Sequence, residues 1–300
     1  MRSADFWSLP LRRPRIGLAL GSGAARGWAH VGVIQALEEE GIAIDVVSGT
    51  SAGAFIGAFY AADEMEGLLK FSEQVTRFHH NLRFMDFTLD GRGILEGERF
   101  IRLMGRHLKA RSFTDLRKPL GITATDLVEM TEVHITQGAL LPAVRASVAV
   151  PGMVKPLEWE GRRLVDGGVL SPVPVNLARS LGADIVIAVD ITTFPPRNMD
   201  NVLNVMYRTI DTMMNRIQVM NRHIDKPEVV IQPDLDEVSF FDNHLSHLAI
   251  ERGYQAARAV MPQIKSLLGS SLAEAFKKAS AQIRTDSLGR LLSRFPVLRK

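Results

Sequence analysis

The 300-residue chain contains no cysteine, which excludes disulfide bonds and thiolate metal sites. It has no apolar run close to the roughly 20 residues that a membrane-spanning helix needs, because its most apolar stretch covers only residues 52–62. The first 14 residues carry three arginines but lack the apolar segment of a secretory signal peptide. We therefore expect a cytoplasmic protein that is soluble or, at most, peripheral to the inner face of a membrane.

The small net charge of +3 conceals an uneven distribution of charge. Residues 1–15 carry +3 and residues 262–300 carry +6, so the body between them carries −6. Basic ends on an acidic body suggest peripheral contact with an anionic membrane, and solvated tails that aid solubility are the alternative interpretation. We expect no nucleic-acid partner, and the sequence leaves the oligomeric state open.

Strands and helices alternate over the first 62 residues, which predicts a parallel sheet with right-handed crossovers. Apolar runs and helical spacing place strands at 15–20 and 44–47, and helices at 28–40 and 52–62. Later apolar runs that fit the same sheet lie at 120–125, 133–136, 185–189 and 229–232, and a short strand candidate lies at 162–165. The predicted fold class is α/β.

The domain organisation follows from composition. We expect a basic tail at 1–14, a catalytic domain at 15–262 and a basic helical extension at 263–300, with Pro262 kinking or dividing a helix at 244–268. A helical insertion is expected at 63–118. Its phenylalanines, Phe78, Phe84 and Phe87, and the methionine-bearing helix at 201–223 are candidates for a cap or for a channel that admits flexible apolar chains, with ordinary core packing as the alternative.

The segment Gly49-Thr-Ser-Ala-Gly53 matches the pattern Gly-x-Ser-x-Gly. This pattern places a serine on a sharp strand-to-helix turn that projects its hydroxyl from the sheet, and side chains at the two glycine positions would collide with neighbouring backbone. The segment follows a predicted strand and precedes a predicted helix. Ser51 is therefore the candidate nucleophile, and Gly49 and Gly53 are the candidate elbow glycines.

A second glycine-rich loop, Gly21-Ser-Gly-Ala-Ala-Arg-Gly27, also joins a strand to a helix. Its backbone N–H groups could cradle a dinucleotide pyrophosphate or stabilise the oxyanion of an acyl-transfer intermediate. The dinucleotide pattern fails at Arg26, and no acid ends the second strand. The oxyanion interpretation is favoured because this loop and the serine turn leave the same edge of neighbouring strands. Arg26 itself holds the loop, binds an anionic head group or is a plain surface arginine.

Asp166-Gly-Gly168 follows the short strand candidate at 162–165. An aspartate before two glycines is usually a simple turn, but a nucleophilic serine needs a base. The eight histidines lie on helices, in the charged insertion or in a strand, and each is more readily a surface or packing residue. Asp166 is therefore the candidate base.

Three motifs in this order resemble those of the patatin-like phospholipases, in particular the short single-domain bacterial branch: Gly21–His30, Gly49–Gly53 and Asp166–Gly168. The resemblance covers residues 15–190 and includes the segments 91–95, 123–127 and 145–153. It implies a three-layer α/β/α fold with a mostly parallel sheet and hydrolysis of phospholipid or other lipid acyl esters, with no metal or cofactor. It also implies a Ser51–Asp166 dyad and an oxyanion hole from the backbone around Gly23 and Ala24. The implied site residues are Ser51, Asp166, Gly21, Gly23, Ala24, Arg26, Gly27, Gly49, Gly53, Gly167 and Gly168.

Other functions stay open at this stage. A Ser-His-Asp hydrolase is permitted by the order Ser51, Asp166 and a late histidine (His223, His244 or His247), although that fold generally places several strands before its nucleophile. An acyltransferase would use the same serine and aspartate. A regulatory or binding protein that retains the site belongs to a different class, and a dinucleotide-binding enzyme is the most distant alternative.

Overall fold

The computed structural model describes residues 13–77, 86, 93–192, 200–239 and 242–294. The strands within these residues are β1 (Ile16–Leu20), β2 (Val46–Thr50), β3 (Leu120–Asp126), β4 (Thr131–Ile135), β5 (Leu157–Trp159), β6 (Arg162–Asp166), β7 (Ile185–Val189) and β8 (Val229–Ile231). The helices are α1 (Trp28–Glu39), α2 (Ala52–Ala62), α3 (Met65–Arg77), α4 (Glu98–His107), α5 (Leu140–Ser147), α6 (Val175–Ser180), α7 (Val202–Asp225) and α8 (Ser246–Arg294). Short 3₁₀ turns include η1 (Ala24–Gly27) and η4 (Gly167–Val169).

The eight described strands form one mixed sheet in the order β5-β6-β3-β2-β1-β7-β8, with β4 paired to β3 off this path. The centre of the sheet is parallel, because β2 pairs with β3, β1 with β2 and β7, and β7 with β8 in that sense. The strands at one side, β4, β5 and β6, pair in the antiparallel sense. The site lies where the two senses meet.

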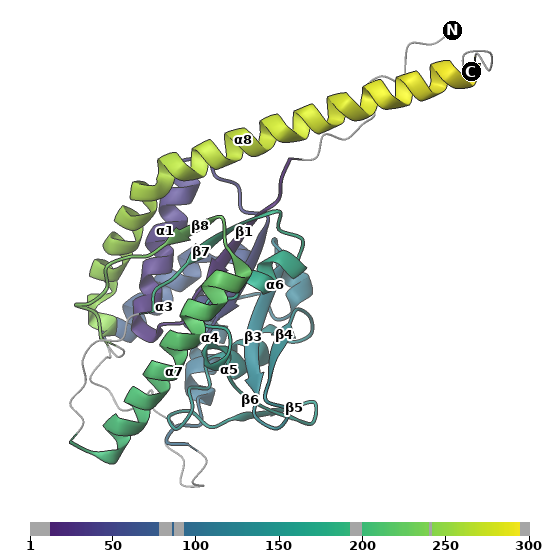
Figure 1. Cartoon of the computed structure of the whole chain (residues 1–300). Helices are drawn as coiled ribbons and strands as arrows, with labels where there is room; N and C mark the ends of the chain where they lie inside the picture. The colour runs from purple at the N-terminus through teal and green to yellow at the C-terminus, as the bar shows by residue number, and fades with distance from the viewer. Residues whose placement is uncertain (1–12, 78–85, 87–92, 193–199, 240–241, 295–300) are drawn as a thin grey trace. The chain divides into compact units, whose positions relative to one another are not determined.

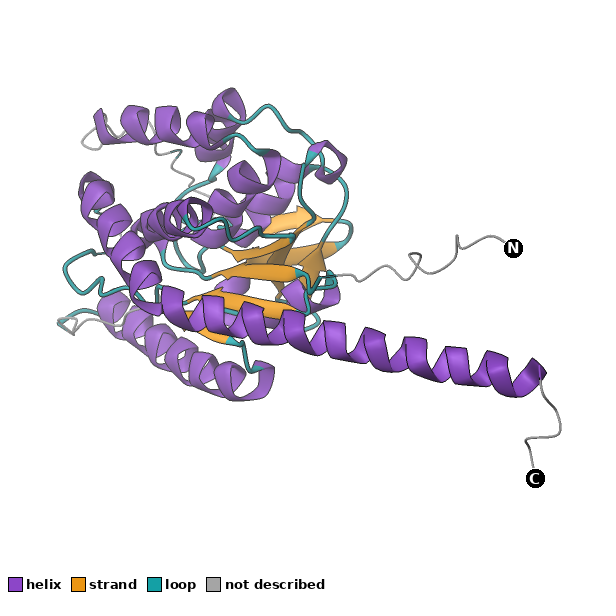
Figure 2. Ribbon diagram, turned by 90° about the horizontal axis from the view of Figure 1, so that it is seen from above, coloured by secondary structure: helices purple, strands orange, loops and turns teal. Residues whose placement is uncertain are grey.

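Helices cover both faces of the sheet (Figure 2). Close contacts at glycines show which helix covers which face. A Cβ added to Gly57 of α2 would touch the strand residues Val47 and Leu20. A Cβ added to the strand residues Gly17 or Gly121 would instead touch side chains of α6 or of the turn after it. Because successive strand residues point to opposite faces, α2 and α6 cover opposite sides. The predicted α/β class with helices on both faces of a mostly parallel sheet is confirmed.

Some details differ from the sequence-based expectation. The second strand, Val46–Thr50, begins two residues and ends three residues later than the expected 44–47, so it runs directly into the serine. The strand near 133–136 is antiparallel to its neighbour, since it follows β3 through the tight turn at Leu127–Met130. The late helix, expected at 244–268, is continuous over Ser246–Arg294 and is not divided at Pro262.

The described part of the 63–118 region contains α3 and α4, which pack against α2 and each other. The rings of Phe55 on α2, Phe71 on α3 and Phe100 on α4 lie 5.0–5.7 Å apart, centre to centre. The expected apolar cap residues Phe78, Phe84 and Phe87 lie outside the described residues. The contacts of Phe71 and Phe100 with Phe55 hold α3 and α4 against the side of α2 that faces away from the sheet.

The chain divides into two compact units. Arg15–Val260 form one unit, which holds the sheet and every candidate site residue, and Met1–Pro14 with Met261–Lys300 form the other. Over the described residues, no helix is both long enough and apolar enough to cross a bilayer.

Candidate active site

Ser51 lies on a strained turn between β2 and α2. Its backbone has φ 55° and ψ −115°, a combination that L-residues adopt rarely and at a cost. The turn is tightly packed, because a Cβ at Gly49 would lie 2.5 Å from the Gly53 carbonyl oxygen and one at Gly53 would lie 2.0 Å from the Leu20 oxygen. The strain is held in place by neighbours that leave no room for side chains at either glycine. The elbow geometry expected from Gly-x-Ser-x-Gly is present.

The pairing of β3 explains how Asp166 reaches this turn. Thr123 of β3 pairs with Thr50 of β2, and the next residue, Ala124, pairs with Asp166 of β6. At both positions β4 occupies the other side of β3. Therefore β2 and β6 follow one side of β3 from opposite directions and meet end to end. Their last residues bring the serine and the aspartate together.

The Ser51 side chain lies beside the Asp166 carboxylate and acts on its pKa as a hydrogen-bond donor. Both residues are only 6% exposed, and the Gly168 N–H donates to Asp166 Oδ1 at 2.7 Å. Burial raises the pKa of Asp166 to about 6, while the hydrogen bonds from Ser51 and Gly168 act in the opposite direction. The carboxylate is thus ionised at neutral pH, yet it is a stronger base than an exposed aspartate.

Polar side chains that the sequence did not single out fix the two strand ends. Ser147 Oγ, at the end of α5, accepts a hydrogen bond of 2.8 Å from the Ser51 backbone N–H. The Thr50 hydroxyl donates to the Ser171 carbonyl at 2.8 Å and lies 2.7 Å from the Thr123 hydroxyl. Ser147 lies in the segment 145–153, which the family resemblance included. The contact of Ser147 with Ser51 nevertheless depends on the packing of α5 against β3 and β6, which the sequence does not reveal.

The loop at 21–27 lies beside the elbow, because a Cβ at Gly27 would meet that of Ala52 at 2.6 Å. The N–H groups of Gly21 and Ser22 are bound to the carbonyls of Val189 and Pro172. Within the described residues no acceptor is recorded for the amides of Gly23 and Ala24, and both residues are partly exposed between buried neighbours. These two amides are therefore accessible donors beside the serine turn.

Two buried side chains hold this loop in shape. Arg26, which is 5% exposed, donates from Nε to the Val238 carbonyl at 2.8 Å. His30 Nε2 lies 2.8 Å from the Gly21 carbonyl, and burial lowers the pKa of His30 to about 4. The neutral imidazole therefore donates to this carbonyl.

No histidine is recorded as a partner of Ser51 or Asp166 within the described chain. The late candidates are engaged elsewhere, since His223 Nδ1 lies 2.8 Å from the Val219 carbonyl and His244 faces Asp242 at 3.9 Å. His247 lies on α8. Over the same residues, no three His, Asp or Glu side chains gather in a way that could hold a metal ion.

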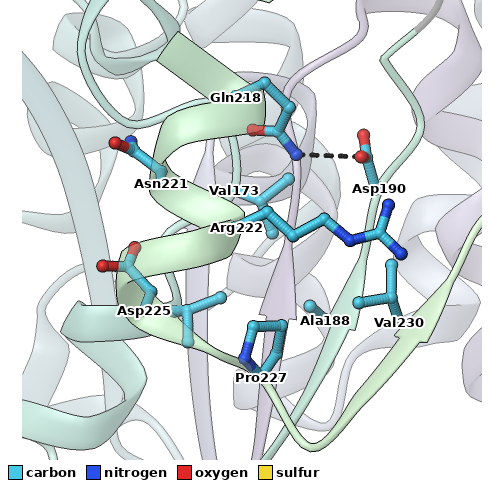
Figure 3. Close-up of a pocket in the computed structure, with 10 residues that line it drawn as sticks. Val173, Ala188, Asp190, Gln218, Asn221, Arg222, Asp225, Pro227 and Val230 are labelled. Carbon is cyan, nitrogen blue, oxygen red and sulfur yellow. Dashed lines mark hydrogen bonds between the residues drawn. The ribbon is translucent and has the colours of Figure 1, made fainter.

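A pocket lies away from the dyad, between α7 and the β7 and β8 side of the sheet (Figure 3). The pocket lining includes a buried hydrogen bond of 2.8 Å from the Gln218 amide to Asp190. None of the predicted site residues lines the pocket. Helix α7, which forms one wall of this pocket, also comes close to the dyad. A Cβ added at Gly168, two residues after Asp166, would lie 3.2 Å from Met214 Cε of α7.

Comparisons with known proteins agree with the motif order. The family model described as patatin-like phospholipase matches residues 18–179. An uncharacterised NTE family protein of Mycobacterium tuberculosis is 39% identical over 178 residues, which are 59% of this chain and 49% of that protein. The patatin-like phospholipase domain-containing protein 7 of Rattus norvegicus is 34% identical over 209 residues, covering 67% of this chain and 15% of that protein. The chain thus matches about half the length of its mycobacterial relative.

Two solved structures are similar at lower identity. VipD of Legionella pneumophila matches 84% of this chain and 67% of its own, with 14% identity and a TM-score of 0.47. ExoU of Pseudomonas aeruginosa, in complex with SpcU, matches 93% of this chain and 62% of its own, with 15% identity and a TM-score of 0.41.

Proposed function

Because the chain belongs to the patatin-like phospholipase family, we propose that it is a serine acyl hydrolase that cleaves lipid acyl esters through Ser51 and Asp166. The observation that carries the proposal is the meeting of the strained Ser51 turn with the buried Asp166 at the ends of β2 and β6, where burial raises the pKa of the carboxylate to about 6. A base with this pKa accepts a proton readily and is still ionised at neutral pH.

The reaction would proceed in two transfers. Ser51 Oγ attacks the ester carbonyl carbon while its proton moves to Asp166, and collapse of the tetrahedral intermediate releases the alcohol, which takes that proton. Water then attacks the acyl-serine, gives a proton to Asp166 and releases the acid as Ser51 regains its hydrogen. An alcohol in place of water would give acyl transfer, so the balance between the two depends on which acceptor reaches the acyl-enzyme.

The amides of Gly23 and Ala24 would stabilise the oxyanion. Their N–H groups have no recorded acceptor within the described residues, and Ala24 has a positive φ of 49° that turns the chain at this point. Loss of one such donor typically costs about 3–4 kcal/mol of transition-state stabilisation. His30 and Arg26 support this role indirectly, because both fix the carbonyl and turn positions of the loop.

The test is a pair of substitutions assayed with a chromogenic short-chain ester and a fluorophosphonate probe. Ser51→Ala should abolish turnover and labelling, and Asp166→Asn should nearly abolish turnover. Ser72→Ala, on α3 and outside the site, serves as the matched control and should retain both. Full turnover by either dyad variant contradicts the assignment. Retained folding without labelling of the wild type would instead favour a regulatory protein with an inactive site.

Histidine substitutions separate the dyad from a Ser-His-Asp triad. His223→Gln, His244→Gln and His247→Gln should each leave ester turnover within about twofold of the wild type, since none is recorded on the dyad. A loss of 100-fold or more in one of them would favour the triad.

We also infer an electrostatic contact between the basic ends and anionic membranes. The charges of +3 on residues 1–15 and +6 on residues 262–300 support it. Binding to anionic vesicles should then weaken as salt rises from 0.05 to about 0.5 M, because the Debye length shortens over this range. Salt-independent binding would discard this role for the ends.

A further inference from the structure

Helix α7 turns its polar side toward the body of the protein. Gln218, Asn221 and Asp225 of α7, the green helix labelled in Figure 1, lie on this side at helical spacing, and each takes part in a hydrogen bond with the domain. Their partners are Asp190 at 2.8 Å, the Leu170 carbonyl at 3.0 Å and Asn176 at 2.6 Å. These bonds fix the rotation of α7 about its axis. Polar contacts therefore help to set its orientation.

The outward side of α7 carries an apolar stripe. Met206, Met213 and Met220 recur every seven residues and are 54%, 60% and 47% exposed, and Ile224 is 68% exposed. The half-buried Ile210 and Ile217 fill the intervening turns. A helix packed on a globular domain ordinarily faces such a stripe inward. A contiguous apolar surface of this kind on a folded domain marks an interaction site.

The stripe adjoins the catalytic centre. Met214 follows Met213 on the same helix, and its Cε lies beside Gly168. The turn at 127–130 follows the end of β3. Because Thr123 of β3 pairs with Thr50, the residue before Ser51, this turn lies at the same edge of the sheet as the elbow. It exposes Leu127, Val128 and Met130 at 46%, 62% and 80%. Apolar exposure thus collects on α7 and on the edge that carries the dyad.

Two occupants would suit an apolar helical stripe: a second copy of α7 or a lipid surface. In a pair of helices the positions that flank the seam face charged counterparts on the partner. On α7 the positions on one side of the stripe are Arg216 and His223, and those on the other side are Met214 and Asn221. If two copies of α7 paired along the stripe, Arg216 would therefore face no acidic residue at these positions. The carboxylate of Asp225 is turned inward to Asn176. A lipid surface needs no such complement and accepts flexible methionines.

We propose that the apolar stripe of α7 (Met206, Ile210, Met213, Ile217, Met220 and Ile224) docks on a lipid bilayer. The docked helix holds the catalytic edge against the surface from which the ester leaves. This inference rests on the proposed function, since it names the physical source of the substrate that Ser51 attacks. Apolar burial drives the contact, so it differs from the electrostatic contact inferred for the basic ends.

The test measures co-sedimentation with vesicles of pure phosphatidylcholine, which have no net charge. The protein is the full chain with Ser51→Ala, so that binding is observed without turnover. Met206→Gln/Met213→Gln/Met220→Gln in this background should lower partitioning at least tenfold, at both 0.05 and 0.5 M salt. Leu69→Gln, at a 45% exposed leucine on α3, is the matched control and should bind as the parent does. Circular dichroism and thermal unfolding establish that each variant is folded.

Three outcomes would overturn the proposal. Equal binding by the triple variant and its parent excludes the stripe as the contact. Binding that disappears at 0.5 M salt belongs to charged segments. A parent that is dimeric without lipid, converted to a monomer by the triple substitution while vesicle binding stays equal, assigns the stripe to a second copy. Hydrolysis of a soluble short-chain ester is measured separately, so failure of the dyad and failure of docking are distinguishable.

With Ser51 intact, turnover gives a second readout. The ratio of phosphatidylcholine-vesicle hydrolysis to soluble-ester hydrolysis should fall at least tenfold in the triple variant. An unchanged ratio contradicts docking through α7.

Discussion

Helices α2 and α7 approach the dyad from different directions and are held in opposite ways. All eleven residues of α2 are buried, and it packs on the sheet, on the loop at 21–27 and on the phenylalanines of α3 and α4. Among the described α7 side chains only Gln218, at 8% exposure, is buried, and the helix contacts the rest of the domain in part through hydrogen bonds. A helix that is apolar all round belongs to a core, whereas an outward apolar stripe belongs to an interface.

The different packing of α2 and α7 suits two different requirements of an acyl hydrolase: a fixed nucleophile and an adaptable substrate-binding side. The nucleophile needs a fixed position, because misplacement by about 1 Å can cost on the order of 100-fold in rate. Close packing around α2 provides this rigidity. The substrate side must admit acyl chains of variable shape, and a helix with a few polar anchors and several methionines can adjust to them. Substitutions on α2 should therefore change stability and kcat, and substitutions on α7 should change substrate binding.

The largest expected effect is that of Gly53→Ala in the first turn of α2. Its Cβ would lie 2.0 Å from the Leu20 carbonyl oxygen, a contact that backbone must move to relieve. We expect a loss of at least about 4 kcal/mol in the free energy of unfolding, together with loss of activity. Gly57→Ala in the same helix is the control, because its Cβ would come no closer than 3.3 Å to a side chain. Urea denaturation should show the control within about 1 kcal/mol of the wild type. Equal stability of the two variants would show that the elbow is not tightly packed.

The elbow and the alternating strands could be predicted because their causes are local. Gly49, Ser51 and Gly53 lie within five residues, and the strand, turn and helix that they require are visible in the same segment. The meeting of Ser51 with Asp166 could not be derived locally, since it depends on β6 entering antiparallel to β3 and ending opposite Ala124. The lack of a suitable histidine made Asp166 a candidate base, and the order of the three motifs strengthened that choice, but neither shows that the two residues meet in space.

The side-chain environment was equally hidden from the sequence. A methionine repeat on a helix predicts a buried stripe as readily as an exposed one, and the hydrogen bonds of Gln218 and Asn221 decide between them. The same holds for Ser147, which gains its contact with Ser51 from a helix that starts nearly ninety residues later in the chain.

The next effect concerns the buried carboxylate. Burial raises the pKa of Asp166 from 3.8 to about 6, so the folded state binds this proton more tightly than the unfolded state does. Folding stability therefore falls as pH rises from about 4 to 6 and stays lower above this range. The shift of about two units corresponds to roughly 3 kcal/mol. Asp166→Asn should be up to about 3 kcal/mol more stable than the wild type at pH 8 and no more stable at pH 4, as measured by urea denaturation at both values.

The same ionisation should appear in the rate of the wild-type enzyme. The value of kcat/KM for a soluble ester should be level above pH 7 and fall about tenfold per unit well below pH 6, because the protonated carboxyl cannot accept the Ser51 proton. A rate that stays level down to pH 4 would contradict Asp166 as the base.

A smaller effect is expected from Ser147→Ala, which leaves the buried Ser51 N–H without its acceptor. An unpaired buried donor costs about 1–3 kcal/mol. If the bond positions the nucleophile, kcat should fall roughly tenfold with KM within twofold. Ser180→Ala is the control, because this serine bonds to the Leu177 carbonyl away from the elbow. A purely structural role would lower the unfolding temperature while leaving kcat unchanged.

The smallest effect tests the polar anchoring of α7. Gln218→Ala removes the amide that donates to Asp190 at 2.8 Å, and we expect a loss of about 1–2 kcal/mol in unfolding free energy. Because Met214 of α7 lies beside Gly168, next to the dyad, KM for a long-chain ester should rise several-fold while kcat stays within twofold. Asn215→Ala, at an exposed position of the same helix, should change neither quantity. A fall in kcat with KM unchanged would mean that α7 helps to hold the nucleophile, and the division of tasks between the two helices would be wrong.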